Sequence, residues 1–102
     1  MFGKIGDMMG KLQEMKQKTE EIKNKLEFMT ATVEAAGGDI KVLINGNRKI
    51  QSVQISPALQ HGDKDELEEQ LTVALNRAIA KADEMNENEM KTVAGSMLPG
   101  MF

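Results

Sequence analysis

A narrow apolar stripe near the start of the chain most constrains how the chain can fold. The stripe recurs at alternating steps of four and three residues, with charged residues between most of its members: Met8, Leu12, Met15, Thr19, Ile22, Leu26 and Met29. A period of 3.5 residues is typical of a coiled-coil seam, which is narrower than the face a helix buries in its own domain. The pattern predicts a helix of about 35 Å. A chain of 102 residues is too short to build a core around this helix, so we expect a second copy to cover the stripe.

The composition is typical of a folded protein, and we expect one domain over residues 1–102 with flexible ends at 1–6 and 95–102. Hydrophobic residues make up 40% of the chain and charged residues 28%. The sequence contains no Cys, no long uncharged apolar run and no basic, apolar leader. These absences predict a cytoplasmic protein that neither crosses nor binds a membrane.

The charge is distributed unevenly along the chain. The net charge of -3 argues against a cationic coat that would bind nucleic acid by charge alone. However, residues 1–49 carry nine Lys and Arg against seven Asp and Glu, whereas residues 50–102 carry four against nine. An anionic partner should therefore prefer the N-terminal half.

The order of elements is predicted to be helix, three strands, helix. The first helix should begin after Gly6 with Asp7 as its N-cap. A strand follows from Phe28 to the Gly37-Gly38 turn, and a second strand alternates from Asp39 to Ile44. The sequence Asn45-Gly46-Asn47 predicts a hairpin, because Asn and Gly tolerate the positive φ angles of tight turns. The third strand should run from about Lys49 to Pro57, completing an antiparallel meander.

The second helix should start at Asp63, which has the spacing of a capping box with Glu66, and run to about Val93. Its apolar stripe is broader than that of the first helix and contains several alanines, which allow close packing on a sheet: Leu67, Leu71, Ala74, Leu75, Ala78, Ile79, Ala82 and Met85. We expect this helix to make most of the core contacts.

The residue pattern provides little support for catalysis, a metal or a cofactor. His61 is the only histidine and lies in a predicted turn, without a second histidine or a cysteine to complete a transition-metal site. The acidic clusters at 63–69 and 83–89 lack the glycine-punctuated loop of a calcium site. One histidine cannot serve Ser52, Ser56 and Ser96 as a catalytic base. We therefore predict a protein that is not an enzyme and has no small-molecule substrate.

The lysines of the first helix allow two interpretations. Lys4, Lys11, Lys18 and Lys25 recur every seven residues, so the helix has a cationic edge that would fit a phosphate backbone. Interspersed glutamates such as Glu14 instead suggest ion pairs within the helix, and the residues alone modestly favour this second interpretation. With no Trp or Tyr to stack on single-stranded bases, duplex DNA is the better nucleic-acid candidate.

The whole chain resembles the YbaB/EbfC family of bacterial nucleoid-associated proteins. The resemblance rests on the order of several segments: Met1 to Met9, Leu12-Gln13-Glu14-Met15, the Gly-Gly and Asn-Gly turns, Val53 to Pro57, and Leu98-Pro99-Gly100-Met101-Phe102. It implies an α+β fold of the α-β-β-β-α type, in which dimers join their sheets and project paired helices like tweezers.

The resemblance also implies a function and a site. A nucleoid-associated homodimer would bind double-stranded DNA through its projecting helices, organising the chromosome and modulating expression. The contacts map onto Lys4, Lys11, Lys16, Lys18 and, near acidic residues, Lys91. Binding should be largely sequence-independent, because neither helix starts with the clustered Arg, Asn or Gln of a base-reading helix. The alternative is a non-catalytic adaptor that recruits another protein through the seam, the methionine-rich ends and the acidic second helix.

Overall fold

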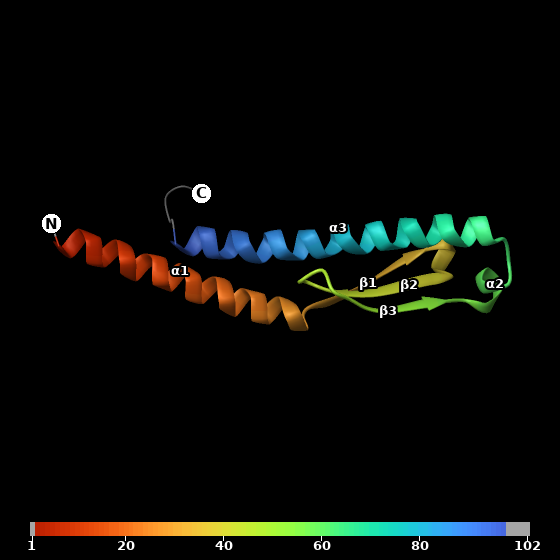
Figure 1. Cartoon of the computed structure of the whole chain (residues 1–102), viewed down its shortest axis with the longest axis horizontal. Helices are drawn as coiled ribbons and strands as arrows, with labels where there is room; N and C mark the ends of the chain where they lie inside the picture. Colours follow the sequence, from red (N-terminus) through yellow and green to blue (C-terminus); the bar gives the residue numbers. More distant parts are fainter. Residues whose placement is uncertain (1, 98–102) are drawn as a thin grey trace.

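The computed structural model describes residues 2–97 as an elongated α+β unit with extents of 70 × 23 × 17 Å (Figure 1). The two long helices are α1 (Phe2–Phe28) and α3 (Lys64–Met97). Between them lie β1 (Thr30–Ala35), the short 3-10 turn η1 (Ala36–Gly38), β2 (Ile40–Asn45), β3 (Ile50–Ile55) and the four-residue helix α2 (Pro57–Gln60). The predicted order of helix, meander and helix is confirmed, and only α2 was not expected.

The helix α1 is longer at both ends than the sequence predicted. It starts at Phe2, so the prediction of Asp7 as its N-cap is wrong, and Asp7 lies inside the helix. The helix continues through Gly10, whose cost in a helix interior is only about 1 kcal/mol relative to alanine. Phe28 is the last residue of α1 rather than the first of a strand. Of the ends expected to be flexible, residues 2–6 belong to α1 and residues 95–97 to α3, whereas 1 and 98–102 lie outside the described residues.

The three strands form an antiparallel sheet in the order β1-β2-β3, as predicted. On β2, Ile40, Val42 and Ile44 are all fully buried, because their side chains share the face on which α3 packs. The pairing of β2 with β3 shifts after Leu43, where a bulge interrupts the register. On the edge strand β3, Ile50 and Val53 remain 43% and 42% exposed.

The helix α3 packs on β1 and β2 through its alanines. Ala74, Ala78 and Ala82 have no exposed surface, which agrees with the predicted close approach of this helix to the sheet. The expected core residue Ile79 is instead 44% exposed. Asp63 caps α3 as predicted, because its carboxylate accepts a hydrogen bond from the Asp65 backbone N–H at 3.0 Å. The missed helix α2 is capped similarly, because the Ser56 hydroxyl accepts from the Leu59 N–H at 3.4 Å.

A second, smaller core joins α1 to α3. Ile22, Leu26 and Val93 are buried together, and Met29 and Met85 pack against them. Beyond this cluster α1 projects past the end of α3 (Figure 1). Within residues 2–97, neither long helix has an apolar stretch suited to crossing a lipid bilayer.

Candidate nucleic-acid interface

The N-terminal part of α1 is a free-standing helix. Every side chain from residue 6 to residue 17 is exposed, and we call this segment the α1 arm. Two of the predicted DNA-contacting lysines, Lys11 and Lys16, lie on it and are exposed. Within the described part of the chain they form no ion pair. The arm therefore presents these two lysines to solvent, although Asp7 and Glu14 bring its net charge to zero.

The other predicted lysines are placed differently. Lys18 follows the arm, is half-buried and forms an ion pair with Glu14 at 3.5 Å, as the interpretation of a helix stabilised by ion pairs predicted. Lys4 belongs to α1, but its side chain is outside the described ones. Lys91 is exposed on α3, directly after the acidic stretch 83–89 of that helix. The structure thus places Lys11, Lys16 and Lys18 on one helix and Lys91 on another.

Other basic residues near the α1–α3 junction face carboxylates. Lys25 lies 3.1 Å from Glu89, Arg48 pairs with Asp83, and Lys49 lies 2.9 Å from Glu27. The groove beside them, about 320 Å³ in volume, contains both signs of charge: Lys18, Glu21, Lys25 and Glu89 around Ile22, Thr92 and Val93. Because these basic side chains already pair with carboxylates of the same chain, they are less available to phosphates than the lysines of the arm.

The predicted dimer seam divides into two parts. Met8, Leu12 and Met15 are 65%, 63% and 43% exposed. Ile22 and Leu26, in contrast, are buried against α3 of the same chain, at 9% and 1% exposure. The 3.5-residue spacing could not separate these parts, because it shows only that a face is apolar and not which element covers it. Only the part on the arm remains available to a second copy.

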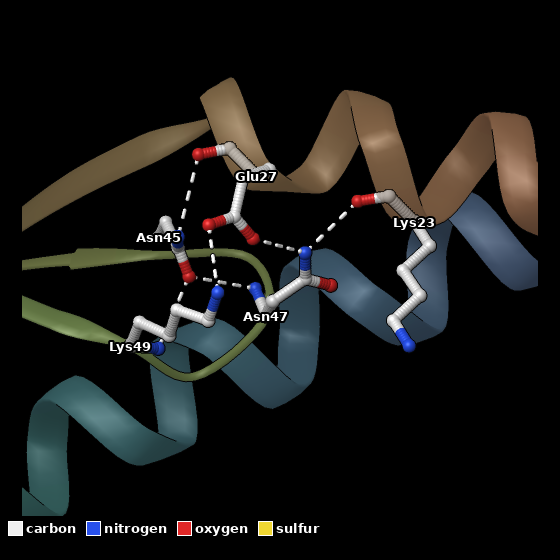
Figure 2. A network of polar contacts seen from close by, with 5 residues as sticks. All are labelled: Lys23, Glu27, Asn45, Asn47 and Lys49. Atoms are coloured by element: carbon white, nitrogen blue, oxygen red, sulfur yellow. Dashed lines mark hydrogen bonds and ion pairs between the residues drawn. The ribbon is translucent and has the colours of Figure 1, made fainter.

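The β2–β3 hairpin closes the C-terminal end of α1, which the sequence analysis did not anticipate. Figure 2 shows the Asn47 side-chain amide between the Lys23 carbonyl and the Glu27 carboxylate, to which it donates at 2.9 and 2.7 Å. The Gly46 N–H donates to the carbonyls of Leu26 and Met29 at 3.0 and 2.9 Å. The last carbonyls of a helix have no partners within it, so the hairpin satisfies them from outside.

Asn45 holds the hairpin itself in shape. Its side chain is 1% exposed, and its Oδ1 accepts from the N–H groups of Asn47 and Lys49 at 2.9 and 3.0 Å. Its amide also donates to the Glu27 carbonyl at 3.3 Å. The hydrogen bond from Asn47, followed by that from Lys49, holds the pKa of Glu27 below its ordinary value. The hairpin and the end of α1 therefore form one polar network.

The positive φ angle of this hairpin falls on Arg48, at 65°, and not on Asn45, Gly46 or Asn47 as predicted. Gly46 is required for another reason. A Cβ at this position would lie 2.5 Å from Leu26 Cδ2 and 3.1 Å from the Leu26 carbonyl oxygen. The glycine allows the hairpin to approach α1 closely enough for its N–H to reach the helix carbonyls.

The residues considered for other chemistry remain dispersed. His61 is exposed at the end of α2, as predicted for a loop histidine. Among residues 2–97, no three His, Asp or Glu side chains are grouped so that they would hold a metal ion. The feature that distinguishes the structure is α1, a lysine-bearing helix that is packed at one end and exposed at the other.

A helix, a three-stranded meander and a second long helix, with a lysine-bearing arm projecting from the first, form the fold of a family of small DNA-binding proteins. The chain belongs to the YbaB/EbfC DNA-binding family, whose sequence profile matches residues 1–97. The resemblance seen in the sequence is confirmed. Membership in a family of DNA-binding proteins also agrees with the prediction that the chain is not an enzyme.

Individual relatives support this assignment. The chain is 41% identical to a nucleoid-associated protein of Caldicellulosiruptor bescii over 71 residues, covering 69% of this chain and 63% of that protein. It is 38% identical to a nucleoid-associated protein of a Thermoanaerobacter species over 80 residues, covering 74% and 72%. The chain thus spans less than two thirds of the length of the C. bescii relative.

The fold is also found in a solved structure. The crystal structure of an uncharacterized protein from Helicobacter pylori superposes with a TM-score of 0.79 at 25% identity, covering 93% of this chain and 98% of that one. The α+β architecture of this chain therefore agrees with that of an experimentally determined structure.

Proposed function

We propose that this chain is a nucleoid-associated protein that binds duplex DNA through the α1 arm, organises the chromosome and modulates gene expression. The observation that carries the proposal is the exposure of Lys11 and Lys16 on a helix that no other element covers. A helix about 10 Å wide that bears lysines can lie along a phosphate backbone. Family membership supports the same partner.

Binding should be largely independent of DNA sequence. Lysine contacts to phosphates position a protein on the duplex but do not identify bases. Moreover, the ion pairs at the α1–α3 junction commit Lys25, Arg48 and Lys49 to carboxylates of the same chain. Few basic side chains remain for the duplex in each protomer, so useful affinity requires more than one arm.

A homodimer would supply the second arm, and the exposed apolar residues support this assembly. Met8 and Leu12 on the arm are more than half exposed, and Ile50 and Val53 on β3 are nearly half exposed. β3 is also an edge strand, with one side of its backbone unpaired in the protomer. We propose that two chains meet through β3 and through the exposed part of the seam: Met8, Leu12 and Met15.

Charged substitutions separate these two surfaces. We expect Val53→Asp and Leu12→Asp each to weaken the dimer, and the double variant to be a folded monomer, because both side chains are exposed in the protomer but would be desolvated between copies. Thr32→Asp, an exposed change on β1, is the control. Sedimentation equilibrium measures the dissociation constant. A parent chain that remains monomeric at high concentration would refute the assembly.

Replacing the lysines on and next to the arm tests the DNA contact. We expect the triple change of Lys11, Lys16 and Lys18 to Gln to weaken binding equally on unrelated duplexes. Each lost phosphate contact lowers the slope of log affinity against log salt by about 0.9, so loss of all contacts from two arms would lower it by about 5. Changing Lys41, Lys64 and Lys81 to Gln removes the same charge from exposed positions elsewhere. Fluorescence anisotropy across a salt series measures both quantities.

The adaptor alternative predicts a different outcome. If the lysines serve only ion pairs such as Lys18 with Glu14, the triple variant would lose a few tenths of a kcal/mol of helix stability and its DNA affinity would not change. Unchanged affinity in a folded dimer would therefore favour recruitment of another protein.

A further inference from the structure

We propose that the β2–β3 hairpin is a positioning device that fixes the direction of the α1 arm, with Asn47 as its principal positioning residue. Asn47 contacts α1 one turn apart, at the Lys23 carbonyl and at the Glu27 carboxylate, with donor–acceptor distances of 2.9 and 2.7 Å. Two contacts spaced along the helix oppose tilting, whereas a single contact would act as a pivot. The consequence for DNA binding rests on the proposed function.

The other contacts of α1, including its packing on α3 through Ile22 and Leu26, also lie toward the C-terminal end of the helix. Gly46 and Asn45 bind the carbonyls at the very end of α1, and Leu26 is packed under Gly46. Among the described side chains of α1, Ile22 is the buried one nearest the N-terminus, Lys18 and Thr19 are half-buried, and every side chain from residue 6 to residue 17 is exposed. The orientation of the arm is thus set between residues 18 and 29, where α1 contacts the hairpin and α3.

A small tilt of α1 at the hairpin produces a large displacement at the N-terminal tip of the arm. The helix from Ile22 to Gly6 is about 24 Å long, so a tilt of about 10° at the hairpin moves the tip by about 4 Å. That displacement is a large part of the spacing between successive phosphates on a strand. The hairpin is therefore placed to determine whether the lysines of two arms meet one duplex together.

The distance between the arm and α3 tests directly whether the hairpin fixes the direction of the arm. The chain has no native cysteine, so spin labels at Gln13→Cys on the arm and Glu69→Cys on α3 are unique. Dilution with unlabelled chain isolates the distance within one protomer. We expect one narrow distribution in the otherwise unmodified chain. A broad distribution there would overturn the proposal before any hairpin variant is made.

Two substitutions at Asn47 then separate hydrogen bonding from packing. Asn47→Ala removes the donor, and the nearly isosteric Asn47→Asp replaces it with a carboxylate that faces a carbonyl and Glu27. We expect both substitutions to shift or broaden the distribution of distances between the two labels. Asn24→Ala, a change at an exposed position on α1, should leave the distance unchanged. An unchanged distance in Asn47→Asp would show that only the shape of the side chain matters, which contradicts the proposal.

DNA affinity provides the functional readout of the experiment. If the arm points correctly for only a third to a tenth of the time, the apparent Kd rises by about three- to tenfold while the salt slope is kept, because the bound state has the same phosphate contacts. Loss of slope together with affinity would mean that phosphate contacts are lost, which the proposal excludes. Failure of the parent to bind DNA would refute the proposed function and leave the distance measurement to decide the positioning.

Discussion

Replacing Gly46 with alanine is expected to destabilise the protein by about 3 kcal/mol, the largest effect we expect from the loss or gain of one methyl group here. The added Cβ would lie 2.5 Å from Leu26 Cδ2 and 3.0 Å from Leu26 Cβ. Leu26 is 1% exposed and packs with Ile22 and Val93, so it has little room to move. The hairpin must retreat from α1, which stretches the hydrogen bonds of the Gly46 N–H.

Gly10→Ala is the matched control, because a Cβ at Gly10 meets no atom within 4 Å. In a helix interior this change should stabilise by up to about 1 kcal/mol, so the two variants are expected to shift the free energy of unfolding in opposite directions. Urea denaturation followed by circular dichroism measures both. A Gly46→Ala chain as stable as the parent would show that the hairpin does not closely contact α1 in solution.

The second large effect on stability is expected at Ile22, which belongs to the same apolar stripe as Leu12 but is buried. We expect Ile22→Asp to destabilise by about 4 kcal/mol, because Ile22 is buried between α1 and α3 and a carboxylate there loses its water. This loss arises within the protomer and should not depend on protein concentration.

Leu12→Asp should behave differently. Leu12 is 63% exposed in the protomer, so the substitution acts only through the proposed dimer. Its effect on the melting temperature should shrink as the protein is diluted, since association stabilises a fold by mass action. Thermal unfolding over a hundredfold range of concentration compares the two variants. Equal, concentration-independent losses at both sites would show that Leu12 is buried within one chain.

The sequence predicted the sheet better than the helices. The alternation of Ile40, Val42 and Ile44 and the turns at Gly37-Gly38 and Asn45-Gly46-Asn47 define the meander, because a strand's faces follow directly from a period of two. The start of α1 was wrong, because the helix continues beyond the residue whose side chain resembled a cap. The exposure of Ile79 was not predicted either, because periodicity cannot show how far a sheet extends beneath a helix.

The candidate site was predictable only in part. The spacing of Lys11, Lys16 and Lys18 indicated a common helix, which the structure confirms, but their engagement of DNA stays a prediction. The hairpin network was beyond sequence reasoning, because Lys23 and Glu27 lie some 20 residues from Asn47 and contribute partly through backbone atoms. Asn-Gly-Asn fits any tight turn, and the closure of a helix end depends on a tertiary contact that no local pattern encodes.

The exposure of the arm on all sides has a consequence for how such a protein can diversify. Substitutions between residues 6 and 17 touch no core of the protomer, so each should alter stability by no more than about 0.5 kcal/mol, apart from glycine, proline and the proposed dimer contacts Met8, Leu12 and Met15. Insertion or removal of seven residues would change the reach by about 10 Å while keeping the same face forward. The charge and length of the arm can therefore change during evolution without altering how the sheet and α3 pack.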